Sequence, residues 1–199
     1  YEEFLDFHRT YYHPSNSYIY LYGNMDMKEK LAFIDQKYLS VFDSLQVDSE
    51  IHEQQPFDKM HDLVMEYPVA ESESEENNSY LAYSVVTGNA LDVLRSTAFD
   101  VLDYALLSTP GAPLKKALLD AGIGSDVYGS YEDGIRQTYF DIVAKGADAS
   151  RKEEFVSIIR KVLTETVEKG IDPKALEAGI NCMEFRYREA DFSSYPKGL

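Results

Sequence analysis

Tryptophan is absent from the chain, cysteine occurs once, and basic residues are scarce. A single cysteine, Cys182, excludes an internal disulfide. It lies between Ile180 and Met183 in a helical pattern, which predicts a small buried thiol rather than a nucleophile. A free thiol suits a reducing compartment. We find no run of about 20 apolar residues that could cross a membrane and no signal peptide, although a missing leader means little in a segment of a longer chain. The location is left open, with an intracellular one, bacterial cytoplasm or organelle, favoured.

The shortage of basic residues leaves a strongly acidic chain. Its 35 acidic and 19 basic residues give a net charge of −16. Such a surface repels the phosphate backbone, which argues against DNA or RNA as a partner. It attracts basic peptides, although solubility alone also explains the charge.

Apolar residues are plentiful enough for a core. They form 44% of the 199 residues, which excludes wholesale disorder. The chain begins with Tyr1 inside an amphipathic helical pattern, and we therefore expect it to be a segment of a longer polypeptide. No second core and no linker is evident, so one α+β domain is the simplest interpretation.

Hydrophobic periodicity predicts an alternation of helices and strands. Helices are expected over 2–12, after the cap Asp26, over 91–107 and 113–121, after Ser150, and after Asp172-Pro173; strands over 17–22, 62–69, 79–87, 126–132 and 137–145. The Asp133-Gly134 pair is typical of a hairpin turn. The strands are joined by hairpins, so we predict a largely antiparallel sheet with helices packed on one face.

Four of the expected helices carry a stripe of mainly apolar residues that should face the core. The stripes are Leu91, Leu94, Ala98, Val101, Leu102 and Ala105; Leu114, Ala117, Leu118 and Ala121; Phe155, Ile158, Ile159, Val162 and Leu163; and Leu176, Ile180, Met183 and Tyr187. Asn89 and Ser150 are expected as N-caps, and Gly122 and Gly170 as C-terminal stops.

No self-contained active site is apparent. His8 and His13 are five residues apart, too far to share a helix face, and His52 and His61 lie in a connector and at a strand edge, so structural roles are favoured over zinc. The turn that carries Glu71, Glu73, Glu75 and Glu76 offers no burial for a general acid and no calcium-loop pattern. Gly122 and Gly124 precede a strand, unlike a phosphate loop. Arg186 and Arg188 should pair with Glu184 or Glu189. We therefore predict no catalytic residue, no cofactor-binding residue and no metal ligand in this chain.

Several segments resemble one peptidase family. The segment 109–118, Thr-Pro-Gly-Ala-Pro-Leu-Lys-Lys-Ala-Leu, with the Ala-Gly-Ile-Gly-Ser-Asp that follows, resembles the helix pair and turn of the non-catalytic second repeat of pitrilysin/insulysin zinc peptidases. The start, Phe-His-Arg-Thr-Tyr-Tyr-His-Pro-Ser-Asn-Ser from Phe7, resembles the junction after the catalytic repeat in the presequence-protease and falcilysin branch. The end, Ser-Tyr-Pro-Lys-Gly-Leu from Ser194, resembles the exit toward the middle of such an enzyme.

The resemblance implies a repeat of the processing-peptidase type, with a ferredoxin-like elaboration. Residues 1–16 would be the last helix and loop of the catalytic repeat, and residues 17–199 one non-catalytic repeat. Zinc in these peptidases is held by H-x-x-E-H, which is absent here, so the cofactor is expected in the parent protein and not in this segment. The fourth repeat of such enzymes adds an Arg and a Tyr; the matching places here hold Lys115, Ala121 and Gly122.

The function implied is that of a part of a zinc metalloendopeptidase that degrades short unstructured peptides. The segment would pack on the zinc-bearing repeat, face the C-terminal half and wall the peptide chamber, and alone it should be inactive. Two alternatives stay open: an inactive partner subunit of the same fold, and an unrelated acidic binding module. Self-association of the isolated segment is also expected if the face that meets the first repeat is bare.

Overall fold

The computed structural model describes residues 1–74 and 76–189, which form two compact units. The units are Tyr1–Pro56 and the described residues from Phe57 onward, and each is described by itself. The tail at 193–199, predicted to be a loop, lies outside the described residues.

The first unit is helical. It contains α1 (Glu2–Tyr11), a 3₁₀ turn η1 (Pro14–Asn16), α2 (Met27–Lys37) and a second turn η2 (Leu39–Val41). Asp26 caps α2 as predicted, because its side chain accepts a hydrogen bond from the Glu29 amide at 3.0 Å.

The strand predicted over 17–22 is wrong. The segment is not paired with any described strand, and Tyr18 and Tyr20 are exposed. The alternation of aromatic and β-branched residues is suitable for a strand, but a strand also needs a partner for its backbone groups. The described part of this unit supplies only helices and loops.

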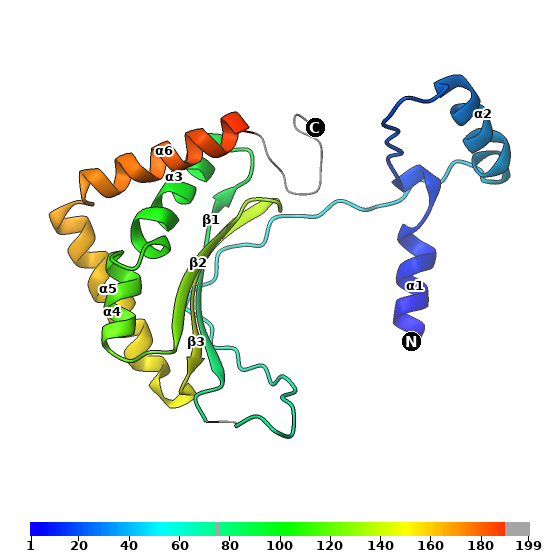
Figure 1. Cartoon of the computed structure of the whole chain (residues 1–199). Coiled ribbons are helices and arrows are strands. Elements are labelled where there is room, and N and C mark those ends of the chain that lie inside the picture. Colours follow the sequence, from blue (N-terminus) through cyan, green and yellow to red (C-terminus); the bar gives the residue numbers. More distant parts are fainter. Residues whose placement is uncertain (75, 190–199) are drawn as a thin grey trace. The chain divides into compact units, whose positions relative to one another are not determined.

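The second unit is built on a three-stranded antiparallel sheet (Figure 1). Its strands are β1 (Ser79–Asn89), β2 (Asp126–Glu132) and β3 (Gln137–Ala147), in the order β1-β3-β2. The hairpin predicted around Asp133-Gly134 is confirmed, since β2 pairs with β3 from Asp126↔Lys145 to Glu132↔Tyr139. The antiparallel α+β class is thereby confirmed as well.

The strand predicted over 62–69 is also wrong. Side-chain contacts anchor this segment near its two ends: Lys152 pairs with Asp62 at 3.1 Å, and the Tyr67 hydroxyl donates to the Asn78 carbonyl. Between them Leu63, Val64 and Met65 are all exposed, so the alternation does not produce one buried face. It makes no ladder with the described strands.

All helices of the second unit lie on one side of the sheet (Figure 1). They are α3 (Val93–Asp103), which continues into a π-helical turn η3 (Tyr104–Ser108), then α4 (Pro113–Asp120), α5 (Lys152–Lys169) and α6 (Pro173–Glu189). The core lies between the helices and the sheet; its fully buried members include Leu114, Leu118, Val127, Phe155 and Ile159. The predicted stripe of α5 therefore faces the core.

The wide π turn was not foreseen. It buries Ala105, Leu106 and Leu107 one after another, so most of the circumference of the turn is covered. The turn ends the helix before Pro110 and directs the chain into α4.

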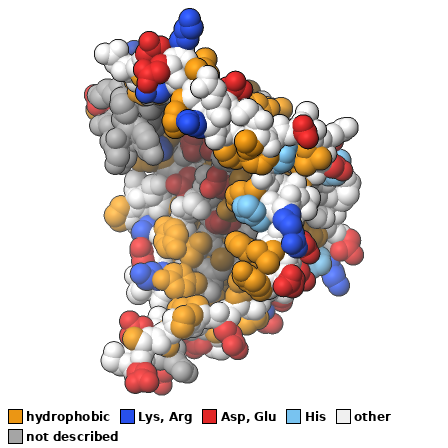
Figure 2. All heavy atoms as spheres, turned by 90° about the vertical axis from the view of Figure 1, so that its right-hand side faces the viewer, with side chains coloured by type: hydrophobic (Ala, Val, Ile, Leu, Met, Phe, Trp, Pro, Cys, Tyr) orange, Lys and Arg blue, Asp and Glu red, His pale blue; other side chains and the backbone are white. Residues whose placement is uncertain are grey.

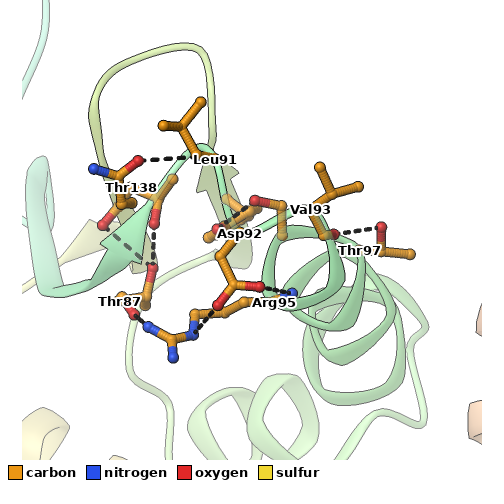
Figure 3. A network of polar contacts seen from close by, with 10 residues as sticks. Thr87, Leu91, Asp92, Val93, Arg95, Thr97 and Thr138 are labelled. Atoms are coloured by element: carbon orange, nitrogen blue, oxygen red, sulfur yellow. Dashed lines mark hydrogen bonds and ion pairs between the residues drawn. The ribbon is translucent and has the colours of Figure 1, made fainter.

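Helix α3 begins later than predicted (Figure 3). Asp92, not Asn89, caps it by accepting from the Arg95 amide at 3.1 Å. The Arg95 guanidinium donates to the Thr87 carbonyl at 3.1 Å and pairs with Asp92, which ties the helix start to the end of β1. Gly88 permits this approach, since a Cβ there would lie 2.5 Å from Nη1 of Arg95. Leu91 and Leu94, predicted to face the core, are exposed.

The cap predicted at Ser150 is likewise shifted. Asp148 accepts from the Ser150 amide at 2.8 Å and opens the short turn η4 (Ala149–Arg151) before α5. The prediction identified the right place for a helix start but the wrong side chain.

The stripe predicted for α6 is partly wrong. Ile180 and Tyr187 are exposed, and so is Cys182, which was expected to be buried. The helix instead approaches α3 through Gly179, where a Cβ would lie 3.2 Å from Val101. A backbone contact of this kind rotates the helix relative to its apolar stripe.

Candidate functional site

The four histidines each have a local partner in the structure. His8 stacks on Tyr12 with ring centroids 4.6 Å apart, and Nδ1 of His13 accepts from the Ser15 amide at 3.2 Å. His52 lies 3.8 Å from Glu50, and His61 contacts the ring of Phe57. Among the described residues, no three His, Cys, Asp or Glu side chains are grouped closely enough to hold a metal ion.

The other acidic and basic candidates are placed on the surface. Glu71, Glu73 and Glu76 are exposed, while Glu75 lies outside the described residues. Arg188 pairs with Glu184 at 2.6 Å, as predicted from their spacing on α6.

The place where related repeats would carry a catalytic tyrosine holds a clamped backbone turn. The Arg151 guanidinium donates to the carbonyls of Ala121 and Gly122, both at 2.8 Å. These carbonyls end α4, and a cation there also complements the helix dipole. Sequence reasoning missed this role of Arg151.

Lys115, which stands where the fourth repeat of such peptidases would carry the arginine, is also engaged in a contact within the fold. Its Nζ lies 3.0 Å from Oδ1 of Asp126 at the start of β2. The hydrogen bond from Lys115, followed by one from the Val127 amide, holds the pKa of Asp126 below its usual value. This lysine therefore stabilises the α4–β2 junction and does not project a free charge.

Two carboxylates of α3, those of Asp100 and Asp103, have pKa values above the usual value for aspartate. Burial raises the pKa of Asp103, and burial together with the Asp133 charge raises the pKa of Asp100. The Ser108 hydroxyl donates to Asp103 at 3.1 Å, but the other carboxylate oxygen is buried and accepts no hydrogen bond. That oxygen lies over Gly129, where a Cβ would be 2.1 Å away.

A groove of about 680 Å³ lies between α4, the end of α5 and the start of α6. The charged side chains that line it include two internal pairs, Lys116 with Asp120 and Lys169 with Glu165. Because these charges neutralise each other locally, the groove presents no convergent set of polar groups to a substrate.

The face of the sheet away from α3, α4, α5 and α6 is not covered by any described helix of the second unit (Figure 1). Figure 2 shows one face of the chain, where hydrophobic side chains gather in patches with acidic side chains among them. Strand register sets the outward side chains in rows across β1, β3 and β2: Tyr80, Lys145, Asp126; Ala82, Val143, Tyr128; Ser84, Asp141, Ser130; and Val86, Tyr139, Glu132.

One member of this open face lacks a partner. Oδ1 of Asp141, in the middle of the central strand, is buried and accepts no hydrogen bond within the described residues. Its cross-strand neighbours are Ser84 and Ser130. The open face thus combines tyrosines, small apolar residues and an unsatisfied carboxylate, which is suited to an interface rather than to catalysis.

The fold of the second unit resembles that of a solved peptidase domain. A similar solved structure is the inactive peptidase domain of a protein assigned as a zinc protease from Bordetella parapertussis, with a TM-score of 0.50 and 16% identity over 57% of this chain and 62% of that one. At that identity the likeness concerns the fold alone. The family model described as the peptidase M16 inactive domain matches residues 1–182. The chain therefore belongs to the peptidase M16 inactive-domain family.

Curated relatives match along the whole chain. Protein HypA of Clostridium perfringens is 47% identical over 100% of the chain. Presequence protease 1 of Arabidopsis thaliana, chloroplastic/mitochondrial, is 34% identical, also over 100%. The mitochondrial presequence protease of Xenopus laevis is 25% identical over 96%. The chain spans about a fifth of the length of these relatives, 20%, 19% and 19% respectively.

Proposed function

We propose that the chain is the non-catalytic second repeat in the N-terminal half of a zinc metalloendopeptidase that degrades short unstructured peptides. The match of residues 1–182 to the peptidase M16 inactive domain carries this proposal. Relatives named presequence proteases, five times longer than the chain, support the rest.

In this proposal the chemistry belongs to another repeat. Zinc and its H-x-x-E-H ligands lie on the preceding repeat, to which residues 1–16 belong as its last helix and loop. Residues 17–199 pack on that repeat and form a wall of the peptide chamber. The neutralised Lys115 and the clamped turn at Ala121 and Gly122 support a structural rather than a catalytic role here.

The acidic charge should make the chamber wall prefer basic peptides. A net charge of −16 attracts basic peptides, and the attraction is screened by salt. An unstructured basic peptide should therefore be captured better than an acidic one of equal length, most strongly at low ionic strength.

The test uses the longer polypeptide in which residues 1–199 occur. We expect it to cleave a fluorogenic basic peptide, to lose that activity to a zinc chelator, and to regain it on zinc addition. The preference for the basic over the acidic peptide should shrink between low and high salt. A polypeptide that never cleaves would be an inactive partner of the same fold, and a salt-independent preference would remove the electrostatic part of the proposal.

A further inference from the structure

The π turn η3 is bridged by the side chains at its two ends. The Ser108 hydroxyl donates to one carboxylate oxygen of Asp103 at 3.1 Å, across the five-residue spacing of a π-helical hydrogen bond. The turn is the last of its helix, and residues 109–112 follow as a loop. It can therefore open or tighten without shifting the register of α3.

The other carboxylate oxygen of Asp103 is enclosed against β2. This oxygen, Oδ1, is buried and accepts no hydrogen bond within the described residues. Gly129 leaves the space for it, since a Cβ there would overlap with Oδ1 of Asp103 and with Cδ1 of Leu107. A buried ionised oxygen without a partner is costly, whereas a neutral carboxyl avoids most of that cost. The closed turn therefore favours the neutral carboxyl.

The charge that acts on this carboxyl is negative. Burial raises the pKa of Asp103, the bond from Ser108 lowers it, and the charge of Asp100, one turn earlier on α3, raises it again. Strand β2 presents Gly129, which has no side chain, and Arg186 of α6 acts on Asp100. The other groups that face Asp100 are the Tyr187 hydroxyl and Asp133. Apart from the Ser108 bond, these surroundings favour the neutral form.

We infer that Asp103 and Ser108 form a proton-dependent latch on η3: the neutral carboxyl keeps the turn closed against Gly129, and the ionised carboxylate withdraws toward water and opens it. Ala105 in the turn and Thr109 directly after it line the groove beside α4, so the latch also changes one wall of that groove. The device lies within this chain and does not depend on the proposed function.

A pH titration of the 199-residue chain by nuclear magnetic resonance tests the latch. We expect the Asp103 carboxyl carbon, the amides of residues 104–108 and the Ala105 methyl group to change with one common pH midpoint. The Ala144 methyl group, fully buried in β3, is the internal reference and should not follow it. Amide exchange of residues 104–108, corrected for its intrinsic pH dependence, should become faster across this midpoint. Linkage sets the size of the increase, about tenfold for each pH unit between the pKa values of the closed and the open carboxyl.

Three variants separate the latch from other titrating groups. Asp103→Asn keeps a neutral group of the same shape, so exchange in the turn should stay slow at every pH. Ser108→Ala removes the bond across the turn and should make exchange faster already at low pH. Asp100→Asn is the matched control, because the pKa of Asp100 is also raised; the pH dependence should persist there, with a lower midpoint.

The outcomes that would overturn the inference are specific. They are turn amides that do not follow the Asp103 carboxyl, a pH dependence that survives Asp103→Asn, and one that disappears in Asp100→Asn. If Asp103→Asn does not fold, the titration of the unsubstituted chain decides by itself. No readout uses peptide cleavage, so a failure of the proposed activity is distinguishable.

Discussion

The Arg151 clamp gives the most direct test of how α4 is held. The guanidinium donates to the carbonyls of Ala121 and Gly122 at 2.8 Å each, and its Nε bonds Glu154 at 2.9 Å. Hydrogen bonds to a charged group contribute about 1.5–3 kcal/mol each when buried. Because the side chain is 33% exposed and the freed carbonyls regain water, we reduce the expected loss for Arg151→Met to about 2 kcal/mol.

The measurement is urea unfolding of the 199-residue chain, followed by far-ultraviolet circular dichroism. Arg188→Met is the matched control, since Arg188 is 78% exposed and pairs only within α6, for an expected loss of about 0.3–0.5 kcal/mol. Arg151→Lys should lie between, because one ammonium cannot bond both carbonyls in the same geometry. If Arg151→Met costs no more than Arg188→Met, the clamp does not stabilise the turn and the reasoning is refuted.

Three further perturbations follow from the packing of the second unit. Gly129→Ala should cost about 1–3 kcal/mol, because the new Cβ would lie 2.1 Å from Asp103 and 2.5 Å from Leu107; an unchanged urea midpoint would contradict this. Ile159→Ala should cost about 2–5 kcal/mol, since the side chain is fully buried in the core, and a loss below 1 kcal/mol would show that the site is not packed. Burial raises the pKa of Asp103, so the folded state binds the proton of this carboxyl more tightly than the unfolded state does. Stability should therefore be lost as the pH rises from the ordinary aspartate range through the raised pKa, and Asp103→Asn should reduce this loss in unfolding curves taken across that pH range. A variant whose stability changes with pH in parallel with that of the unsubstituted chain would refute the reasoning.

The elements that sequence predicts well are those whose signals are local. The Asp133-Gly134 turn specifies its own hairpin, and the stripe around Phe155 and Ile159 identifies both the helix and its buried face. These features need only neighbours within a few residues, which periodicity and turn chemistry report directly.

Features that depend on a distant partner were not predictable. The segments 17–22 and 62–69 have strand-like patterns, but pairing depends on a neighbouring strand that the pattern cannot name. Helix α6 packs through Gly179 rather than through Ile180, because a close backbone approach prevails over the apolar stripe.

The candidate site shows the same division. Sequence reasoning indicated correctly that Arg188 has a partner on its own helix, four residues away. It missed Arg151, whose carbonyl partners lie 29 and 30 residues earlier, and Asp141, whose surroundings come from three strands. In the sequence, only the period of two along β3, with Phe140 and Ile142 on the core side, places Asp141 on the outward face.

The central claim is that this repeat provides structure while the metal chemistry belongs to another part of the polypeptide. The direct measurement is the zinc content and peptide turnover of purified residues 1–199, dialysed against zinc and assayed with a fluorogenic basic peptide. The account predicts much less than one zinc ion bound per chain, and a cleavage rate no higher than that of the peptide incubated without protein. One tightly held zinc ion per chain with chelator-sensitive turnover would contradict it.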